Sequence, residues 1–106
     1  MIVYVSIGNS DDKLTHAEWA EYVRLADYLL GPEPRFVAHR HGAWFSAPAS
    51  PFVNACWCVE FDHGSSEEAV KVGLRALAAK FRQDSIAWAV ADTEFLEPLR
   101  ETGEHA

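Results

Sequence analysis

The order of predicted strands and helices constrains the fold of this chain more than any single motif does. Runs of alternating or continuous apolar residues indicate strands, and apolar residues spaced three and four apart indicate helices. In chain order the predicted elements are strand Ile2–Ile7, helix Thr15–Leu30, strands Arg35–Phe45 and Asn54–Phe61, helix Ser65–Arg82 and strand Ser85–Val90. This β-α-β-β-α-β order predicts a ferredoxin-like α+β fold, with a four-stranded antiparallel sheet of order 4-1-3-2 and two helices on one face.

Both predicted helices begin at a capping signal. Thr15 and Glu18 have the spacing of a capping box, and Ser65 and Glu68 repeat it before the second helix. Gly73 lies in the middle of the second helix, where glycine costs about 1 kcal/mol relative to alanine. A close approach of this helix to the sheet would explain that glycine.

Length and charge limit the classes of protein and of partner. The chain has 106 residues, which suits a single domain over residues 1–99 followed by a disordered polar tail over 100–106. Its net charge of −7 and its scattered basic residues argue against a nucleic-acid partner. No apolar run approaches the ~20 residues of a membrane span, and no leader pattern precedes the first strand. We therefore expect no membrane partner.

Two cysteines, Cys56 and Cys58, lie two residues apart in a predicted strand. Side chains at that spacing share one face of a strand at the wrong geometry for a routine disulfide. We therefore expect reduced thiols and a cytoplasmic protein.

Neither face of the predicted sheet is cleanly polar. Because two helices cover only one face, the other would expose apolar side chains to water. We expect a second copy of the chain to cover that face, which predicts a homodimer that uses the open face or the edge of the second strand. The alternative is that residues 95–99 of the same chain fold back over it.

The first candidate site lies where the first and third predicted strands end. We expect these strands to be central and parallel, so that their carboxyl ends meet at one edge together with the start of the last strand. This loop edge would hold a polar, hydroxylated or cationic small ligand, and its predicted ligand-binding residues are Asn9, Ser10, Asp11, Asp12, His63, Gln83 and Asp84. The alternative is that the acidic residues only complete a turn.

The second candidate is a metal site built from His39, His41, Cys56 and Cys58. If Phe45 pairs with Asn54 in the hairpin, His41 faces Cys58 and the four side chains converge as zinc ligands. A one-residue slip in the pairing would send the two pairs to opposite faces. Buried cysteines also fill cores without binding metal, so no cofactor is predicted.

No sequence motif specifies a catalytic reaction. We therefore predict a non-catalytic binding or regulatory module that holds a protein or a small molecule. The alternatives are a small enzyme with a pocket between sheet and helices, in the manner of dimeric ferredoxin-like monooxygenases, and a His/Cys metal-binding protein. A closed cavity lined by Trp57, Trp88 and a histidine would favour the enzyme, whereas solvated histidines would favour the binding module.

Two stretches, residues 2–14 and 81–88, together with Asn54-Ala55-Cys56-Trp57, carry a family resemblance. In these stretches the chain resembles small uncharacterised proteins of actinobacteria and their phages, over nearly its whole length. The resemblance implies a bacterial or phage cytoplasmic setting and no particular activity.

Overall fold

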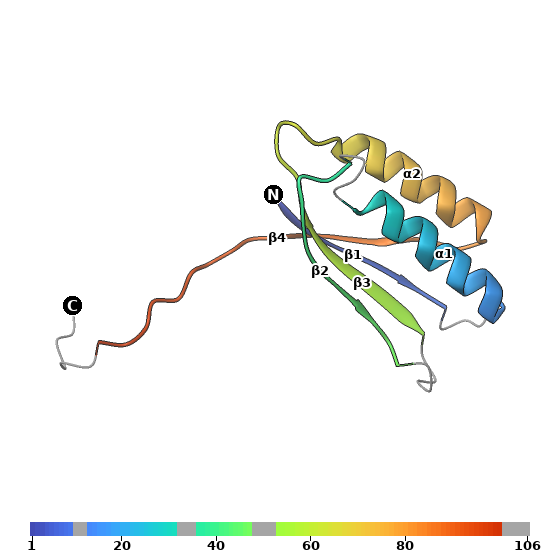
Figure 1. Cartoon of the computed structure of the whole chain (residues 1–106), viewed down its shortest axis with the longest axis horizontal. Helices are drawn as coiled ribbons and strands as arrows, with labels where there is room; N and C mark the ends of the chain where they lie inside the picture. The colour runs from blue at the N-terminus through green and yellow to red at the C-terminus, as the bar shows by residue number, and fades with distance from the viewer. Residues whose placement is uncertain (10–12, 32–35, 48–52, 101–106) are drawn as a thin grey trace.

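A four-stranded antiparallel sheet with two helices forms the body of the protein in a computed structural model, which describes residues 1–9, 13–31, 36–47 and 53–100 (Figure 1). The elements are β1 (Ile2–Gly8), α1 (His16–Leu29), β2 (His39–Phe45), β3 (Asn54–Glu60), α2 (Glu67–Lys80) and β4 (Ala87–Ala91). The predicted second strand begins at His39 rather than at Arg35, which lies outside the described residues.

The strands lie side by side in the order β2-β3-β1-β4, which reads 4-1-3-2 from the opposite edge. β1 and β3 are the central pair, but the prediction that they run parallel is wrong, because Ile2 pairs with Glu60 and Gly8 with Asn54. The reason is topological. The crossover through α1 leaves β2 running in the direction of β1, and the hairpin that follows turns β3 back against both. The carboxyl ends of β1 and β3 therefore lie at opposite ends of the sheet.

Both helices cover the same face of the sheet (Figure 1). Side chains along a strand point alternately to the two faces of the sheet. Every second residue of the two central strands therefore points toward the helices. These are Val3, Val5 and Ile7 of β1 and Ala55, Trp57 and Val59 of β3, all at most 4% exposed. Tyr22 and Ala26 of α1 and Val70 and Leu74 of α2 close the core from above.

One of the two predicted helix starts is confirmed. Thr15 Oγ1 accepts the Glu18 N–H and the Glu18 carboxylate accepts the Thr15 N–H, both at 3.1 Å, which completes the capping box. At α2 the predicted box is wrong, because the N-cap is Ser66 and its side chain makes no capping bond. Ser65 Oγ instead accepts the backbone N–H of Asp62 at 2.7 Å, so that it closes the preceding turn.

Gly73 marks a close approach between the two helices rather than between α2 and the sheet. A methyl group at this position would lie 2.9 Å from Leu29 Cδ1 of α1. The absent side chain therefore lets the helices pack against each other, and the expected contact with the sheet is corrected to a contact with α1.

The face of the sheet opposite the helices is uncovered by the described residues. Tyr4 and Trp44 point to this open face and are 45% and 58% exposed. Residues 95–99 do not fold back over it. Residues 92–100 instead extend away from the body without regular structure (Figure 1). The radius of gyration is accordingly 17.2 Å, against about 13 Å for a compact chain of this length. Residues 101–106 of the predicted tail lie outside the described residues.

Within the part of the chain that the structure describes, neither helix has the length and apolar character needed to cross a bilayer.

Candidate functional site

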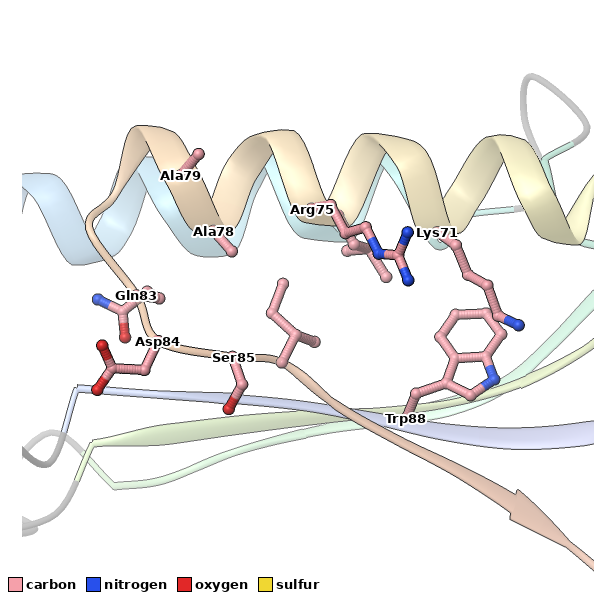
Figure 2. A pocket seen from close by; sticks show the side chains of 10 residues that line it. Lys71, Arg75, Ala78, Ala79, Gln83, Asp84, Ser85 and Trp88 are labelled. Carbon is pink, nitrogen blue, oxygen red and sulfur yellow. The ribbon is translucent and has the colours of Figure 1, made fainter.

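A cleft of about 560 Å³ runs between α2 and the segment that leads into β4 (Figure 2). Its volume falls in the range of small-molecule sites, roughly 300 to 1,000 Å³. Leu74, Ala78 and Ile86 supply its apolar surface. The other lining residues are Lys71, Arg75, Ala79, Gln83, Asp84, Ser85 and Trp88.

The indole of Trp88 is fixed at one end of the cleft by two neighbours. The Phe61 ring stacks on it with centroids 5.6 Å apart, and Lys71 Nζ lies 5.1 Å from the indole centroid. Trp88 Nε1 is buried and has no hydrogen-bond partner among the described residues. A buried donor without an acceptor is costly, so this end of the cleft carries unused hydrogen-bonding capacity.

Two cationic side chains of α2 reach over the cleft from positions i and i+4 (Figure 2). Lys71 Nζ is paired with Glu67 Oε1 at 3.2 Å and with Glu68 Oε1 at 3.8 Å, so its charge is balanced within the helix. Arg75 makes no ion pair or hydrogen bond with any residue that the structure describes. The cleft therefore presents one guanidinium beside an apolar surface, which is an arrangement that attracts an anion.

Gln83, Asp84 and Ser85 form the opposite, polar end of the cleft (Figure 2). Gln83 Nε2 donates to the carbonyl of Phe81 at 2.9 Å, and the Asp84 carboxylate lies 3.5 Å from Lys13 Nζ. Gln83 and Asp84 are thus the two predicted site residues that the structure places in this cleft.

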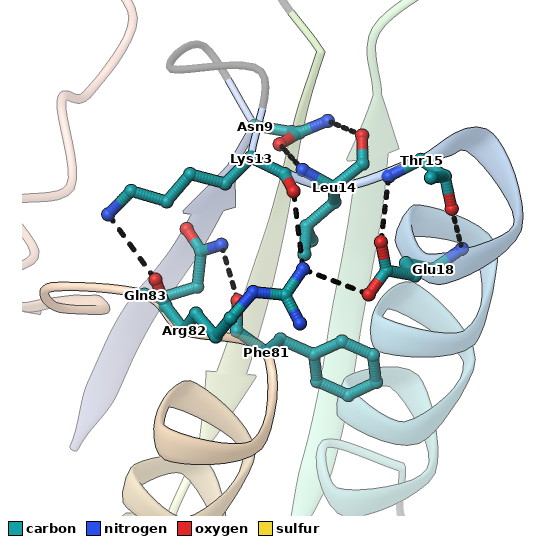
Figure 3. Close-up of polar contacts among 8 residues, drawn as sticks. All are labelled: Asn9, Lys13, Leu14, Thr15, Glu18, Phe81, Arg82 and Gln83. Atoms are coloured by element: carbon teal, nitrogen blue, oxygen red, sulfur yellow. Dashed lines mark hydrogen bonds and ion pairs between the residues drawn. The ribbon is translucent and has the colours of Figure 1, made fainter.

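Asn9 lies near the same end of the sheet but serves the turn after β1. Its side chain is nearly buried, accepts the Leu14 N–H at 3.0 Å and donates to the Leu14 carbonyl at 3.0 Å (Figure 3). Both functions of its amide are used, so Asn9 has a structural role here. It borders a second hollow, near the start of α1, whose lining includes His16 and Trp19.

Arg82 joins the end of α2 to the start of α1. Its guanidinium donates to the Lys13 carbonyl at 3.2 Å and to Glu18 Oε2 at 2.9 Å (Figure 3). Lys13 Nζ returns a hydrogen bond to the Arg82 carbonyl at 3.3 Å. The Thr15 backbone N–H, and after it the Arg82 guanidinium, hold the pKa of the Glu18 carboxyl below its usual value. Much of the polar capacity at this end is therefore satisfied internally.

The predicted loop edge is not brought together as a whole. His63 follows β3 and lies beyond the end of the sheet where Met1 and Phe61 are hydrogen-bonded, whereas Asn9 lies at the other end. Because the central strands are seven residues long, His63 and Asn9 lie about 20 Å apart. The prediction that His63 joins Asn9, Gln83 and Asp84 is wrong, because it rested on parallel central strands. Ser10, Asp11 and Asp12 lie outside the described residues.

His39, His41, Cys56 and Cys58 share the open face of the sheet. Phe45 pairs with Ala55 rather than with Asn54, and a bulge at His41 restores the expected pairing of His39 with Glu60. His41 Nε2 then reaches Glu60 Oε1 at 2.9 Å instead of a thiol. Both cysteines are free thiols, so neither is part of a disulfide. Within the described ranges, no group of three or more His, Cys, Asp or Glu side chains is arranged to hold a metal ion.

The three histidines predicted to bind a ligand or a metal, His39, His41 and His63, are all exposed, and none lines the cleft. Trp57 is completely buried in the core and does not line it either. Sequence reasoning did not single out Lys71 or Arg75. The signal that was available is their i, i+4 spacing on α2, beside the apolar stripe that contains Leu74 and Ala78.

Comparisons of this chain with protein-family models, curated proteins and solved structures found no match.

Proposed function

We propose that this protein is a non-catalytic binding module and that the cleft between α2 and β4 holds a small organic monoanion with an apolar body. The observation that carries this proposal is the Arg75 guanidinium, which stands without an ion pair among the described residues beside an apolar surface. The loop edge was expected to favour hydroxylated or cationic ligands. The cleft differs because its cations lie on α2, at the end where Trp88 closes it.

The chemistry of the two ends sets the ligand class. A carboxylate can accept two parallel hydrogen bonds from a guanidinium, whereas an ammonium group would be repelled. The apolar part of the ligand would pack on Leu74, Ala78 and Ile86. Asp84, 93% exposed at the far end, disfavours a second negative charge there. Small aromatic monocarboxylates meet these conditions.

Isothermal titration calorimetry with a series of such acids, phenylacetate among them, tests the proposal against the corresponding neutral amides. A charge-assisted hydrogen bond contributes about 1.5 to 3 kcal/mol, so we expect the amides to bind at least roughly tenfold more weakly. Arg75→Gln should reduce carboxylate affinity by a similar factor. Lys80→Gln is the matched control, because it removes one positive charge from the same helix outside the cleft.

Three outcomes would overturn the proposal. The carboxylates and amides would bind equally, the Arg75 and Lys80 variants would behave alike, or no acid in the series would bind.

The order of elements and the order of strands also support assignment to the ferredoxin-like class, which we propose as the fold. The spacing of Cys56 and Cys58 remains the basis for predicting a reducing, cytoplasmic setting.

A further inference from the structure

The last described residues carry apolar side chains that the body of the protein does not use. Residues 92–100, the C-terminal arm, leave the end of β4 and extend away from the sheet (Figure 1). Phe95, Leu96 and Leu99 on this arm are 89%, 84% and 91% exposed. Exposed large apolar side chains that cluster in one segment indicate a surface made for contact.

The same molecule has a surface that lacks a cover. Tyr4 of β1 and Trp44 of β2 stand half exposed on the open face, on either side of the cysteines of β3. Ala87 and Ala89 of β4 continue this face as a flat, small-residue strip. Both helices lie on the opposite face, so no described element of the chain covers it.

We propose that two copies of the chain form a two-fold symmetric dimer in which the C-terminal arm of each copy lies on the open sheet face of the other. The dimer is independent of the ligand cleft, because the arm and the open face share no residue with the lining of that cleft.

The sequence of the arm favours exchange over folding back. Two-residue hairpin turns rely on a glycine, usually after Asn or Asp, and the residues that follow β4, Asp92, Thr93 and Glu94, include no glycine. Pro98 restricts Glu97 to extended conformations. The arm therefore continues in the direction of β4 and leaves its own sheet. A two-fold axis lets each copy give one arm and receive one, which closes the assembly.

The length and the charge of the C-terminal arm both suit the open face of a second copy. Nine residues span about 30 Å when extended, whereas four strands span about 14 Å and stacked sheets lie about 10 Å apart. The arm carries the carboxylates Asp92, Glu94 and Glu97. The open face ends at the edge strand β2, where the exposed ring of His39 offers an N–H donor to those carboxylates. The neighbouring ring of His41, 4.6 Å away, is bonded to Glu60.

Multi-angle light scattering across micromolar concentrations tests the assembly with the full chain. The wild type should have twice the monomer mass of 11.8 kDa. The variant Phe95→Ser/Leu96→Ser/Leu99→Ser should be monomeric with an unchanged circular dichroism spectrum, because these side chains make no core contact. Val72→Ser is the control, since Val72 is an exposed apolar residue of α2 and its loss should leave the dimer intact. A monomeric wild type, or a dimeric arm variant, would overturn the proposal.

The native thiols of the open face provide a second readout of where the arm lies. In Leu96→Cys, mild oxidation should join residue 96 to Cys56 or Cys58. A mixture of ¹⁵N-labelled and unlabelled chains should give linked peptides of mixed isotope content, which identifies the bond as intermolecular. Linkage within one chain would show folding back, and a dimer without any linkage from residue 96 would place the interface elsewhere. Either result contradicts arm exchange.

Discussion

The indole Nε1–H of Trp57 donates a hydrogen bond of 2.9 Å to Asp27 Oδ1, which joins the centre of β3 to α1. Arg40 of β2 pairs with the same oxygen at 2.8 Å. Trp57 is completely buried, so its donor depends on this carboxylate rather than on water. One side chain of α1 thus sets the position of the helix over two neighbouring strands.

Asp27→Ala should destabilise the protein by about 1 to 3 kcal/mol, because it leaves the buried indole donor without an acceptor. Asp27→Asn keeps an acceptor oxygen for Trp57 and should lose less. Urea unfolding of both variants measures the difference. Equal losses would mean that the ion pair with Arg40, and not the indole hydrogen bond, carries the effect.

Tyr22 should make stability fall at alkaline pH. Its hydroxyl is buried without a partner among the described residues, and burial raises the pKa of Tyr22 from 10.0 to about 12. Between these values the folded state holds a proton that the unfolded state has lost, so the free energy of unfolding decreases as pH rises.

Tyr22→Phe should be at least as stable as the wild type near neutral pH, since it removes an unsatisfied polar group and keeps the ring stacked on Phe81. Between pH 10 and 12 it should avoid a loss of about 2 kcal/mol. Chemical unfolding of the wild type and of Tyr22→Phe at pH 10 and at pH 12 measures this difference in stability. If the free energy of unfolding of the two proteins fell in parallel with pH, the prediction would be refuted.

Local sequence signals predicted the elements well, and long-range geometry was harder to predict. The alternation in residues 54–60 and the Thr15–Glu18 box follow from spacing alone. The hairpin with β2 makes β3 antiparallel to β1. The prediction that β1 and β3 are parallel therefore placed His63 at the wrong end of the sheet. The bulge at His41 could not be read from the sequence, because both histidines fit either register.

The candidate site shows the same division. Gln83 and Asp84 were predicted as ligand-binding residues, and both line the cleft. The role of Arg75 in binding an anion depends instead on which carboxylates lie within reach of its guanidinium. Lys71 is neutralised by Glu67 and Glu68 within its own helix, whereas Arg75 has no acidic partner in the described structure. The contacts between Lys13 and Arg82 join residues 69 positions apart, a separation at which spacing carries no information.

Gly73→Ala should be close to neutral by itself and stabilising when Leu29 is also shortened. Alanine gains about 1 kcal/mol of helix propensity over glycine, but its methyl group meets Leu29 Cδ1 at 2.9 Å. In a Leu29→Ala background that conflict is absent, so the full gain of about 1 kcal/mol should appear. A double-mutant cycle measured by thermal unfolding tests this, and purely additive effects would exclude the contact.

Arg82 occupies a left-handed backbone conformation, with φ of 57°. Arg82→Gly and Arg82→Ala both remove the side-chain bonds to the Lys13 carbonyl and to Glu18, but only glycine adopts this conformation without a steric penalty. The glycine variant should therefore be more stable than the alanine variant by about 1 kcal/mol. If alanine proves the more stable of the two in denaturant unfolding, the backbone account of this position is wrong.

The most direct test of the binding cleft is an amide chemical-shift titration of the ¹⁵N-labelled protein with phenylacetate and related acids. We predict shifts that centre on residues 71–79 and 83–88 and that saturate with ligand. Half-saturation should need roughly tenfold more ligand in Arg75→Gln and an unchanged amount in Lys80→Gln. Shifts confined to the open sheet face or to the turn around His63, with the cleft silent, would contradict this prediction.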